Sequence, residues 1–462
     1  MSLNVICVGG ITMKRKIYER LLAWKQTEHG QSCILVQGAR RVGKSYIVEA
    51  FAKHEYKSYI LIDFNKTSQE TKDLFLHDLE DLDTFFLKLK AAYNVPLYER
   101  ESVIILDEVQ LFPRARSAMK YLVADGRYDY IETGSLISIK ENIQDILIPS
   151  EEDQIDMYPM DFEEFLWAMG NDTMYPLIRA CFEKRQPMGQ SLHRKAMDLF
   201  RQYMIVGGMP QAVERFVETR DFAAVDRVKR RILNLYRDDI HKHGARNQLK
   251  IEAIFDEIPS QLNNQNRHFK LSALEEHARF SAYAEPLFWL ADAMIVNNCY
   301  NTTDPSIGLK MNQDRTILKC YMGDTGLLIS HAYDENGSVS QEIYRKLLLD
   351  KLEVDMGMVM ENIVAQMLVS GGHKLYFYTN SDRENKDNRM EIDFLIAKQT
   401  TTNRHNISPI EVKSSKRYTL RSIQKFTAKY SEQLHTAYVL HPGDLKVEND
   451  LVYLPLYMTP LL

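Results

Sequence analysis

A loop between an apolar strand and a helix restricts the fold of this chain more than any other feature. Residues 38–45 read Gly-Ala-Arg-Arg-Val-Gly-Lys-Ser and fit the pattern GxxxxGK(S/T). An apolar run at 33–37 precedes the loop, and a helical pattern at 44–52 follows it. Glycines in this setting let the backbone curve around a phosphate group, which the loop N–H groups and the positive end of the helix dipole then face. The sequence therefore predicts a parallel α/β sheet with a phosphate-binding loop.

Two side chains of the loop have predicted chemical roles. Lys44 would reach the β- and γ-phosphates of ATP, and the Ser45 hydroxyl would bind Mg²⁺. A chance match is the alternative, but the strand before the loop and the helix after it favour the functional interpretation. The predicted cofactors are ATP and Mg²⁺, and the predicted cofactor-binding residues are Gly38, Arg40, Arg41, Val42, Gly43, Lys44, Ser45 and Tyr46.

A second apolar strand, at 103–106, runs into the carboxylates Asp107 and Glu108. Asp107 could hold Mg²⁺ through water, and Glu108 is placed to polarise the attacking water. A solvated acidic turn is the alternative, and the presence of a phosphate loop in the same chain disfavours it. With Lys44 and Ser135, Glu108 completes the set of predicted catalytic residues.

The strand at 130–133 ends in Thr133-Gly134-Ser135. A hydroxyl there, Ser135 in our prediction, could sense the γ-phosphate, or it could begin a helix or turn as an N-cap. Arg114 and Arg116 follow the acidic strand, and either could act on the nucleotide of a neighbouring copy. Surface arginines are common, so neither is assigned that role.

Length and composition exclude several classes of protein. The 462 residues suggest about three domains. A net charge of −5 argues against a chain that binds nucleic acid over its whole surface, so any such binding needs a local patch. None of the five cysteines lies in a CxxC pair, which argues against a zinc ribbon and favours the reducing cytoplasm. No apolar run is long enough for a membrane helix.

The pattern of elements divides the chain into four regions, 13–150, 151–245, 246–340 and 341–462. The first alternates strands and helices, with helices expected at 14–30, 44–52 and 74–92 and strands at 33–37, 59–64, 103–106 and 130–133. The second is helical. The third has three helix-sized segments and a strand at 294–299, an order that suits a winged helix. The last has a helix at 356–369, strands at 374–378, 391–397 and 408–413, and a helix after 419.

Four residues of the last region form a second candidate site. Glu361 lies on a predicted helix, Asp393 on a strand, and Glu411 and Lys413 share one face of the next strand. Converging carboxylates can hold Mg²⁺ or Mn²⁺, with Lys413 steadying phosphate charge. The order resembles the PD-(D/E)xK nuclease pattern, although Ile392 replaces its proline. A solvated strand face and an inactive binding module are the alternatives.

Local charge is compatible with nucleic acid near this second site. Residues 402–430 contain seven basic residues and one acidic residue, a local charge of +6. In the third region, Arg267, His268 and Lys270 could touch DNA or could simply solvate a helix end.

Several stretches together resemble prokaryotic AAA-type ATPases with a C-terminal uncharacterised domain. They are the phosphate loop, Asp107-Glu108, residues 132–135, residues 158–165 (Tyr-Pro-Met-Asp-Phe-Glu-Glu-Phe), residues 207–210 (Gly-Gly-Met-Pro) and residues 321–327 (Tyr-Met-Gly-Asp-Thr-Gly-Leu). The resemblance implies an additional-strand P-loop fold in 13–150, a helical region in 151–245, a winged-helix-like domain in 246–340 and a restriction-endonuclease-like α/β domain in 341–462.

Three functional hypotheses follow. The first is an AAA-type ATPase that hydrolyses ATP with Mg²⁺ and acts on nucleic acid. The second is a nucleotide-gated signalling or scaffold protein with slow turnover, a protein partner and an inactive nuclease-like domain. The third is a metal-dependent nuclease regulated by ATP. AAA-like ATPases often form rings, so a homo-oligomer is expected.

Overall fold

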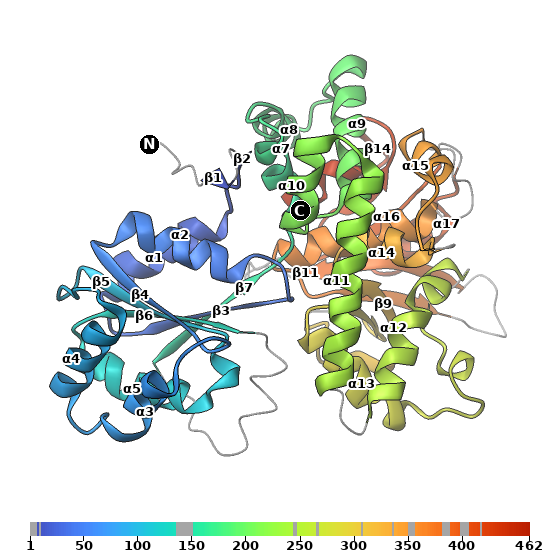
Figure 1. Ribbon diagram of the computed structural model, residues 1–462. Helices are drawn as coiled ribbons and strands as arrows, with labels where there is room; N and C mark the ends of the chain where they lie inside the picture. Colours follow the sequence, from blue (N-terminus) through green and yellow to red (C-terminus); the bar gives the residue numbers. More distant parts are fainter. Residues whose placement is uncertain are drawn as a thin grey trace. The chain divides into compact units, whose positions relative to one another are not determined.

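The computed structural model describes residues 7–8, 11–134, 151–243, 247–264, 268–305, 308–334, 337–349, 356–380, 389–397, 406–415 and 418–462. The chain forms two compact units (Figure 1). Unit 1 comprises Met1–Tyr158 and Asp292–Met294, and unit 2 comprises Pro159–Ala291 and Ile295–Leu462.

Unit 1 is built on a sheet of five parallel strands in the order β4-β5-β6-β3-β7. The strands are β3 (Cys33–Gly38), β4 (Ser58–Asp63), β5 (Ser102–Asp107), β6 (Asp129–Gly134) and β7 (Glu152–Met157). Two short strands, β1 (Cys7–Val8) and β2 (Ile11–Thr12), form a separate pair. Because β6 lies between the phosphate-loop strand β3 and the acidic strand β5, the sheet has the additional-strand order that the resemblance implied.

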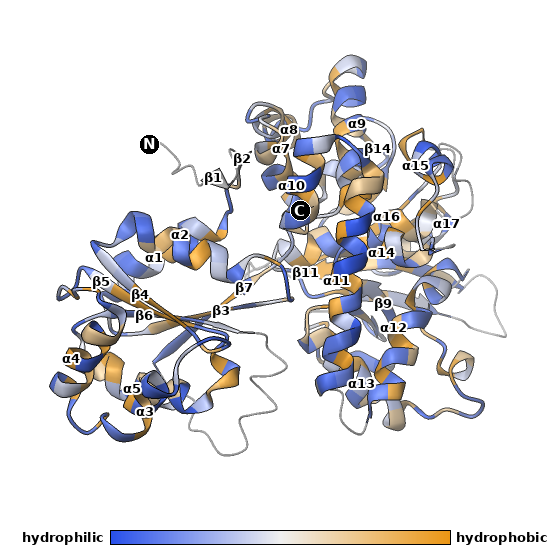
Figure 2. Cartoon of the chain, viewed as in Figure 1, coloured by the Kyte–Doolittle hydropathy of each residue, from blue (hydrophilic) through white to orange (hydrophobic). Residues whose placement is uncertain are grey.

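Helices cover both faces of this sheet (Figure 1). One face carries α1 (Ile17–Glu28) and α2 (Lys44–Glu55), and the other carries α3 (Gln69–His77), α4 (Leu82–Tyr93) and α5 (Pro113–Asp125). Along β5, Val103 and Ile105 pack towards α1 and α2, whereas Ile104 and Leu106 pack towards the other three helices. A strand covered on both sides needs apolar residues at successive positions, and the middle of the sheet is accordingly orange in Figure 2.

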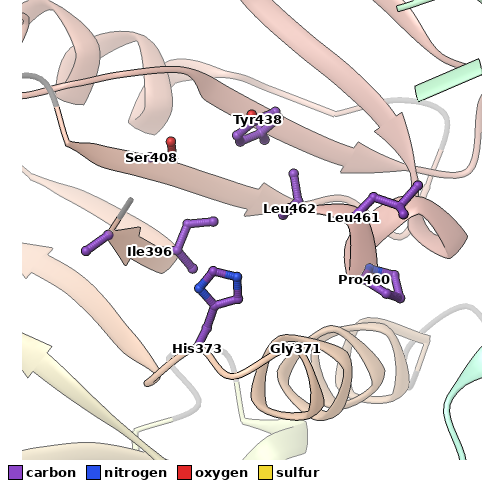
Figure 3. Close-up of a pocket in the computed structure, with 9 residues that line it drawn as sticks. Gly371, His373, Ile396, Ser408, Tyr438, Pro460, Leu461 and Leu462 are labelled. Carbon is purple, nitrogen blue, oxygen red and sulfur yellow. The ribbon is translucent and has the colours of Figure 1, made fainter. Parts of the chain in front are cut away.

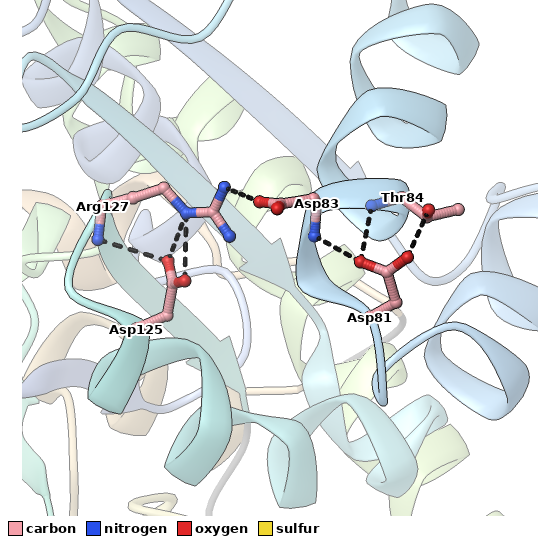
Figure 4. Close-up of polar contacts among 5 residues, drawn as sticks. All are labelled: Asp81, Asp83, Thr84, Asp125 and Arg127. Carbon is pink, nitrogen blue, oxygen red and sulfur yellow. Dashed lines mark hydrogen bonds and ion pairs between the residues drawn. The ribbon is translucent and has the colours of Figure 1, made fainter.

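The single helix predicted at 74–92 is two helices, because Asp81 starts a new one. Its carboxylate accepts hydrogen bonds from the backbone N–H groups of Asp83 and Thr84 at 3.1 and 3.2 Å (Figure 4). These are two of the N–H groups that lack partners at a helix start, so an N-cap here favours a break. Arg127, which is paired with Asp125, also bonds the Asp83 carboxylate at 2.6 Å.

The sheet of unit 1 extends beyond the boundary predicted at residue 150. Its fifth strand, β7, pairs in parallel with β3 from Cys33↔Glu152 to Gly38↔Met157. The segment 152–157 contains mostly polar residues because β7 is an edge strand, and the sequence pattern therefore gave little indication of it.

The residues after Tyr158 begin with helices. These are α7 (Phe162–Ala168), α8 (Met174–Glu183), α9 (Gln190–Val206), α10 (Pro210–Thr219), α11 (Phe222–His243), α12 (Gln248–Asn263) and α13 (Phe280–Asp292), with a 3₁₀ turn, η4 (Leu271–Ala273). The helical region predicted at 151–245 therefore starts after β7.

A second sheet of eight strands completes unit 2, in the order β14-β15-β13-β12-β11-β10-β8-β9. The strands are β8 (Val296–Thr302), β9 (Gln313–Met322), β10 (Tyr376–Asn380), β11 (Met390–Ala397), β12 (Ile407–Val412), β13 (Ala437–His441), β14 (Lys446–Glu448) and β15 (Leu451–Pro455). Antiparallel β8 and β9 belong to this sheet because β8 pairs with β10. The strand predicted at 294–299 in the winged-helix-like region 246–340 thus corresponds to β8 and belongs to the sheet of the C-terminal region.

Around the sheet lie α14 (Thr325–Ala332), α15 (Gln341–Leu348), α16 (Met356–Ser370), α17 (Arg421–Lys429) and a 3₁₀ segment, η6 (Leu456–Leu461). The C-terminal part follows the order α16-β10-β11-β12-α17-β13. Its first three strands are antiparallel neighbours, and β13 is parallel to β12. Ile423 and Phe426 of α17 pack into an apolar cluster with residues of these four strands.

Candidate functional site

The phosphate loop has two residues with positive φ and one glycine that packing requires. Gly43 has φ 100° and Arg41 has φ 69°, a value uncommon for a residue with a side chain. A Cβ atom on Gly38 would lie 2.3 Å from the Met157 carbonyl oxygen. The first glycine is therefore needed for contact with β7, and the second for the turn into α2.

Lys44 is buried at the start of α2, and its ammonium donates to the loop carbonyls of Gly38 and Ala39 at 2.9 and 3.1 Å. The loop itself is closed by a bond from Val42 N to Ala39 O of 3.3 Å. Phosphate oxygens are stronger acceptors than these carbonyls, so the ammonium is well placed to contact a polyphosphate. Tyr46, predicted to bind the cofactor, packs against the core beneath α2.

Arg15 supports the loop and was not among the predicted residues. Its guanidinium donates to the Val42 carbonyl at 3.0 Å and to the Tyr158 carbonyl at 2.6 Å. The phosphate loop is thereby tied to the end of β7. No sequence motif marks this arginine, which lies 27 positions before Val42.

Ser45 of the phosphate loop and Asp107 of the acidic strand are in contact. The Ser45 hydroxyl donates to Asp107 Oδ1 at 2.7 Å, and the Thr133 hydroxyl donates to the same oxygen. These side chains come from α2, β5 and β6, whose ends are adjacent because β6 separates β3 from β5. The convergence joins the phosphate loop, the acidic strand and the intervening strand in one site.

Thr133, rather than Ser135, is the hydroxyl that the described residues bring to this site. Thr133 Oγ1 also accepts from the Glu108 backbone N–H at 3.3 Å. The predicted catalytic Ser135 lies outside the described residues. The segment Thr133-Gly134-Ser135 indicated a hydroxyl near the acidic pair. It did not show whether the Thr133 or the Ser135 hydroxyl would contact that pair.

Glu108 follows β5 with φ 54°, and its carboxylate accepts a hydrogen bond from the Gln110 side-chain amide. A left-handed conformation in a residue other than glycine is frequent at functional sites. Gln110, in the 3₁₀ turn η1 (Val109–Leu111), holds the Glu108 carboxylate in a defined orientation and was not predicted.

The two arginines after the acidic strand have different environments. Arg116 is buried and makes two bonds to the Glu152 carboxylate, at 2.8 and 3.0 Å, with Glu132 at 4.0 Å. Burial, followed by the charge of Glu152, raises the pKa of Glu132. Arg116 is thus committed to the interior of unit 1, whereas Arg114 is exposed.

At the second candidate site, Glu411 and Lys413 form an ion pair on one face, as the two-residue period of the strand predicted. The Asp393 carboxylate accepts from the Val412 backbone N–H at 2.8 Å. Burial raises the pKa of Glu411 to about 7, against the lowering effect of Lys413, and Asp393 adds to the rise. Glu411 Oε2 is buried and has no hydrogen-bond partner among the described residues.

Lys319 of β9 lies among the other carboxylates, although no motif pointed to it. Its ammonium is 2.7 Å from Glu391 Oε1, 3.9 Å from Asp393 Oδ1 and 4.0 Å from Glu361 Oε2. The Tyr321 hydroxyl donates to Glu361 at 3.1 Å. Over the described ranges, no three His, Cys, Asp or Glu side chains are arranged to hold a metal ion. The metal site predicted on Glu361, Asp393 and Glu411 therefore has no support from this geometry.

Other predicted contacts are less informative. His268 is partly buried, 3.8 Å from Glu391 and against the Phe377 ring, whereas Lys270 is exposed. Arg267 and part of the basic stretch at 402–430 lie outside the described residues. A pocket of about 290 Å³ near the end of α16 is lined by residues such as His373 and Ser408 and by none of the predicted carboxylates (Figure 3).

Three stretches that supported the resemblance meet inside unit 2. Met160 N donates to Gly208 O at 2.7 Å, and Gly208 N donates to Asp324 Oδ2 at 2.6 Å. The Tyr203 hydroxyl donates to Met160 O at 2.8 Å. These contacts assign the stretches a structural role, since they connect the start of unit 2 with α9, α10 and α14.

Family models match three separate parts of the chain. Residues 30–166 match an AAA domain. Residues 197–337 and 356–458 match two domains of unknown function, DUF8612 and DUF4143. No curated protein matches the chain. The AAA match includes the phosphate loop, the acidic strand and β6, and it supports an ATP-binding AAA-type ATPase domain in this part of the chain.

The chain also has low similarity to solved structures. A Walker-type ATPase of Pyrococcus abyssi has 13% identity and a TM-score of 0.41, over 69% of this chain and 96% of that one. The RuvB Holliday junction branch migration motor of Thermotoga maritima has 12% identity and a TM-score of 0.29, over 62% and 89%. AMPPCP-bound DnaA of Aquifex aeolicus has 11% identity and a TM-score of 0.26, over 63% and 80%. With TM-scores this low, the ATPase assignment is based on the AAA match and the site geometry.

Proposed function

We propose that the chain binds ATP with Mg²⁺ at the junction of α2, β5 and β6 and hydrolyses it. The observation that carries the proposal is the bond of 2.7 Å between the Ser45 hydroxyl and Asp107, which joins two motifs 62 residues apart. A phosphate loop and an acidic strand that meet across an intervening strand are the parts that phosphoryl transfer needs for positioning and charge stabilisation.

The side chains at this junction fit Mg²⁺. Magnesium prefers oxygen ligands and keeps several waters, and a hydroxyl and a carboxylate oxygen are available side by side on Ser45 and Asp107. When bound, the ion would neutralise charge on the β- and γ-phosphates. Lys44 would contact the same phosphates, and the Thr133 hydroxyl would keep Asp107 oriented.

Glu108 is the proposed general base for the attacking water. It directly follows Asp107, and Gln110 orients its carboxylate. Positioned acid–base catalysis contributes about 10²- to 10⁴-fold to rate, which sets the size of the expected loss in a variant.

We propose a nucleic-acid-directed or regulatory role for this hydrolysis. The basic stretch at 402–430 favours nucleic acid. The alternative is a nucleotide-gated scaffold. It is favoured by the ion pairs that Lys319 makes with carboxylates of the C-terminal sheet and by the partial burial of His268. The order α16-β10-β11-β12-α17-β13 supports a restriction-endonuclease-like fold for the C-terminal part, without implying cleavage.

Oligomeric state and location are further proposals. Arg114 is exposed and stays a candidate for contact with a neighbouring copy in a homo-oligomer. Four described cysteines are free thiols, in keeping with the reducing cytoplasm: Cys33, Cys181, Cys299 and Cys320. No described helix combines the length and apolar character needed to cross a membrane.

Two substitutions test the ATPase proposal. Lys44→Ala should weaken ATP binding because it removes the positive charge that contacts the phosphates. Glu108→Gln should leave binding intact and reduce turnover by about 10²-fold or more. Binding is measured by titration with a fluorescent ATP analogue and Mg²⁺, and turnover by phosphate release. Turnover in Glu108→Gln equal to that of the parent would exclude Glu108 as the base.

The parent protein then separates the two roles. Turnover stimulated by single- or double-stranded DNA supports the nucleic-acid role. Bound ADP or ATP that persists through purification, with negligible turnover and no response to DNA, supports the scaffold. Arg114→Ala tests whether Arg114 of one copy acts on the nucleotide of another. The loss of turnover in this variant should then appear only at concentrations at which the protein self-associates.

A further inference from the structure

A buried lysine of the chain, Lys319, lies among carboxylates at the C-terminal sheet. Lys319 is 1% exposed, and three carboxylates from two other elements lie within 4.0 Å of its ammonium. Glu361 comes from α16, and Glu391 and Asp393 come from β11. An ammonium buried to this extent is stable only where carboxylates and other groups compensate for its lost hydration.

Surrounding groups hold Lys319 in this position. The ring of Phe377 lies 5.0 Å from the ammonium, which gives a cation–π contact. Next along the same face of β9, the Tyr321 hydroxyl donates to Glu361 and keeps that carboxylate turned inward. The lysine is thus packed on one side and paired on the other.

The ammonium and a divalent ion would compete for the same carboxylates. Mg²⁺ binds oxygens at about 2.0–2.1 Å with nearly octahedral geometry. The Lys319 ammonium lies within 4.0 Å of Asp393 Oδ1 and Glu361 Oε2, so its charge would repel a divalent ion held by these oxygens. The remaining carboxylate, Glu411, is paired with Lys413 instead.

We propose that Lys319 is a built-in cation that replaces the metal ion predicted among Glu361, Asp393 and Glu411. The C-terminal sheet then carries a metal-free lysine–carboxylate cluster, and its contribution to function is binding rather than metal-dependent cleavage of nucleic acid. This inference goes beyond the proposed ATPase and does not depend on it.

The test is a titration of the nucleotide-free, full-length protein with Mn²⁺. The electron paramagnetic resonance signal of free Mn²⁺ measures how much of the ion is bound. An Asp107→Asn background removes the carboxylate of the ATPase site. We expect no Mn²⁺ bound at the C-terminal cluster in this parent. Lys319→Met should create a site for one Mn²⁺. Its affinity should exceed any residual Mn²⁺ affinity of the parent cluster by at least about tenfold, because the carboxylates then lack the lysine charge. Adding Asp393→Asn should abolish the new site.

Lys229→Met is the matched control, since Lys229 is also fully buried in unit 2 with Asp226 and Asp324 nearby. Two carboxylates rather than three interact with Lys229, and Arg230 already bonds one of them, so Lys229→Met should create no Mn²⁺ site. Folding of each variant is checked by thermal melting, and Lys319→Gln serves if the methionine variant does not fold.

Two results would overturn the proposal. One is Mn²⁺ binding by the parent that Asp393→Asn or Glu411→Gln abolishes, which would show that the lysine does not exclude the ion. The other is a folded Lys319 variant with no gain in Mn²⁺ binding. The parent measurement alone decides the first point, even if every Lys319 variant is unstable.

Discussion

At the scale of single residues, two glycines of this protein, Gly38 and Gly208, are needed for close contact rather than for a positive φ. Gly38 is required by the Met157 carbonyl, and a Cβ atom on Gly208 would lie 2.2 Å from the Met160 carbonyl oxygen. Both contacts involve backbone atoms, which cannot move aside cheaply. The glycine pair at 207–208 therefore reflects how α9, α10 and α14 join.

Gly207 allows a matched test of this interpretation. It has φ 82° and ψ −175°, and Gly189 has φ 82° and ψ 152°. Alanine in this region costs about 1–3 kcal/mol at either position. At Gly207 the new Cβ would also lie 2.2 Å from Asp324 Oδ1, whereas Gly189 has no atom within 4 Å of that position. Because hydrogen bonds fix Asp324, we expect Gly207→Ala to cost about 1–3 kcal/mol more.

Urea unfolding followed by circular dichroism would measure the difference in the free energy of unfolding between these two variants. Equal losses would mean that the cost is backbone strain alone and that Asp324 moves freely.

At the scale of elements, α11 is unusual because a fully buried lysine takes part in its packing. Lys229 is fully buried and donates to the Ile205 carbonyl at 2.7 Å. Asp226, one turn earlier, accepts from Ser330 and Arg230 at 2.6 and 2.7 Å. The polar residues of α11 thus connect it with α9 and α14, within a buried stripe that also contains Val225, Ile232 and Tyr236.

This lysine predicts a pH dependence of stability. Burial lowers the pKa of Lys229 to about 8, although Asp226 and Asp324 oppose the shift. Between about pH 8 and its ordinary value of 10.5, the unfolded chain binds more protons at this group, so its penalty on folding decreases as pH rises. Relative to Lys229→Met, the parent should gain stability across that window, by an amount on the order of 3 kcal/mol at most.

Free energies of unfolding at pH 7.5 and pH 10 give the comparison. Lys242→Met, an exposed position on the same helix, is the control, and its difference from the parent should not change with pH. A constant difference for Lys229→Met as well would exclude a lowered pKa at this group.

At the scale of the whole molecule, the two units have separate sheets and separate cores. The proposed nucleotide site is made entirely by elements of unit 1. A ligand stabilises only the cooperative unit that binds it, and proteins with more than one domain often unfold in more than one step.

Calorimetry of the full chain should therefore show ATP with Mg²⁺ raising the melting temperature of one transition. At a ligand concentration about 100 times the Kd, the stabilisation is about 2.7 kcal/mol. Lys44→Ala should lose most of this shift while the other transition stays in place. A single transition that shifts as a whole with ATP would show that the two units unfold as one.

Local patterns in the sequence determined much of unit 1. The motif at 38–45 and the apolar run at 103–106 predicted β3 and β5, because strands covered on both faces must be apolar throughout. The strand predicted at 130–133 is part of β6. The predicted roles of Ser45 and Asp107 came from short motifs, which depend only on residues close in the sequence. The helix expected at 356–369 and the pairing of Glu411 with Lys413 followed from periodicity in the same way.

Only the tertiary structure decided which distant side chains meet. Arg15 and Lys319 lie in no motif, and Thr133 lies in a segment for which the prediction named Ser135 instead. Each of the three acquires its partners through strand order and helix packing. The hairpin β8–β9 joins the C-terminal sheet because β8 pairs with β10, a contact across about 75 residues that no local pattern encodes. Periodicity reports which face of an element is buried, whereas the identity of the neighbour depends on the chain as a whole.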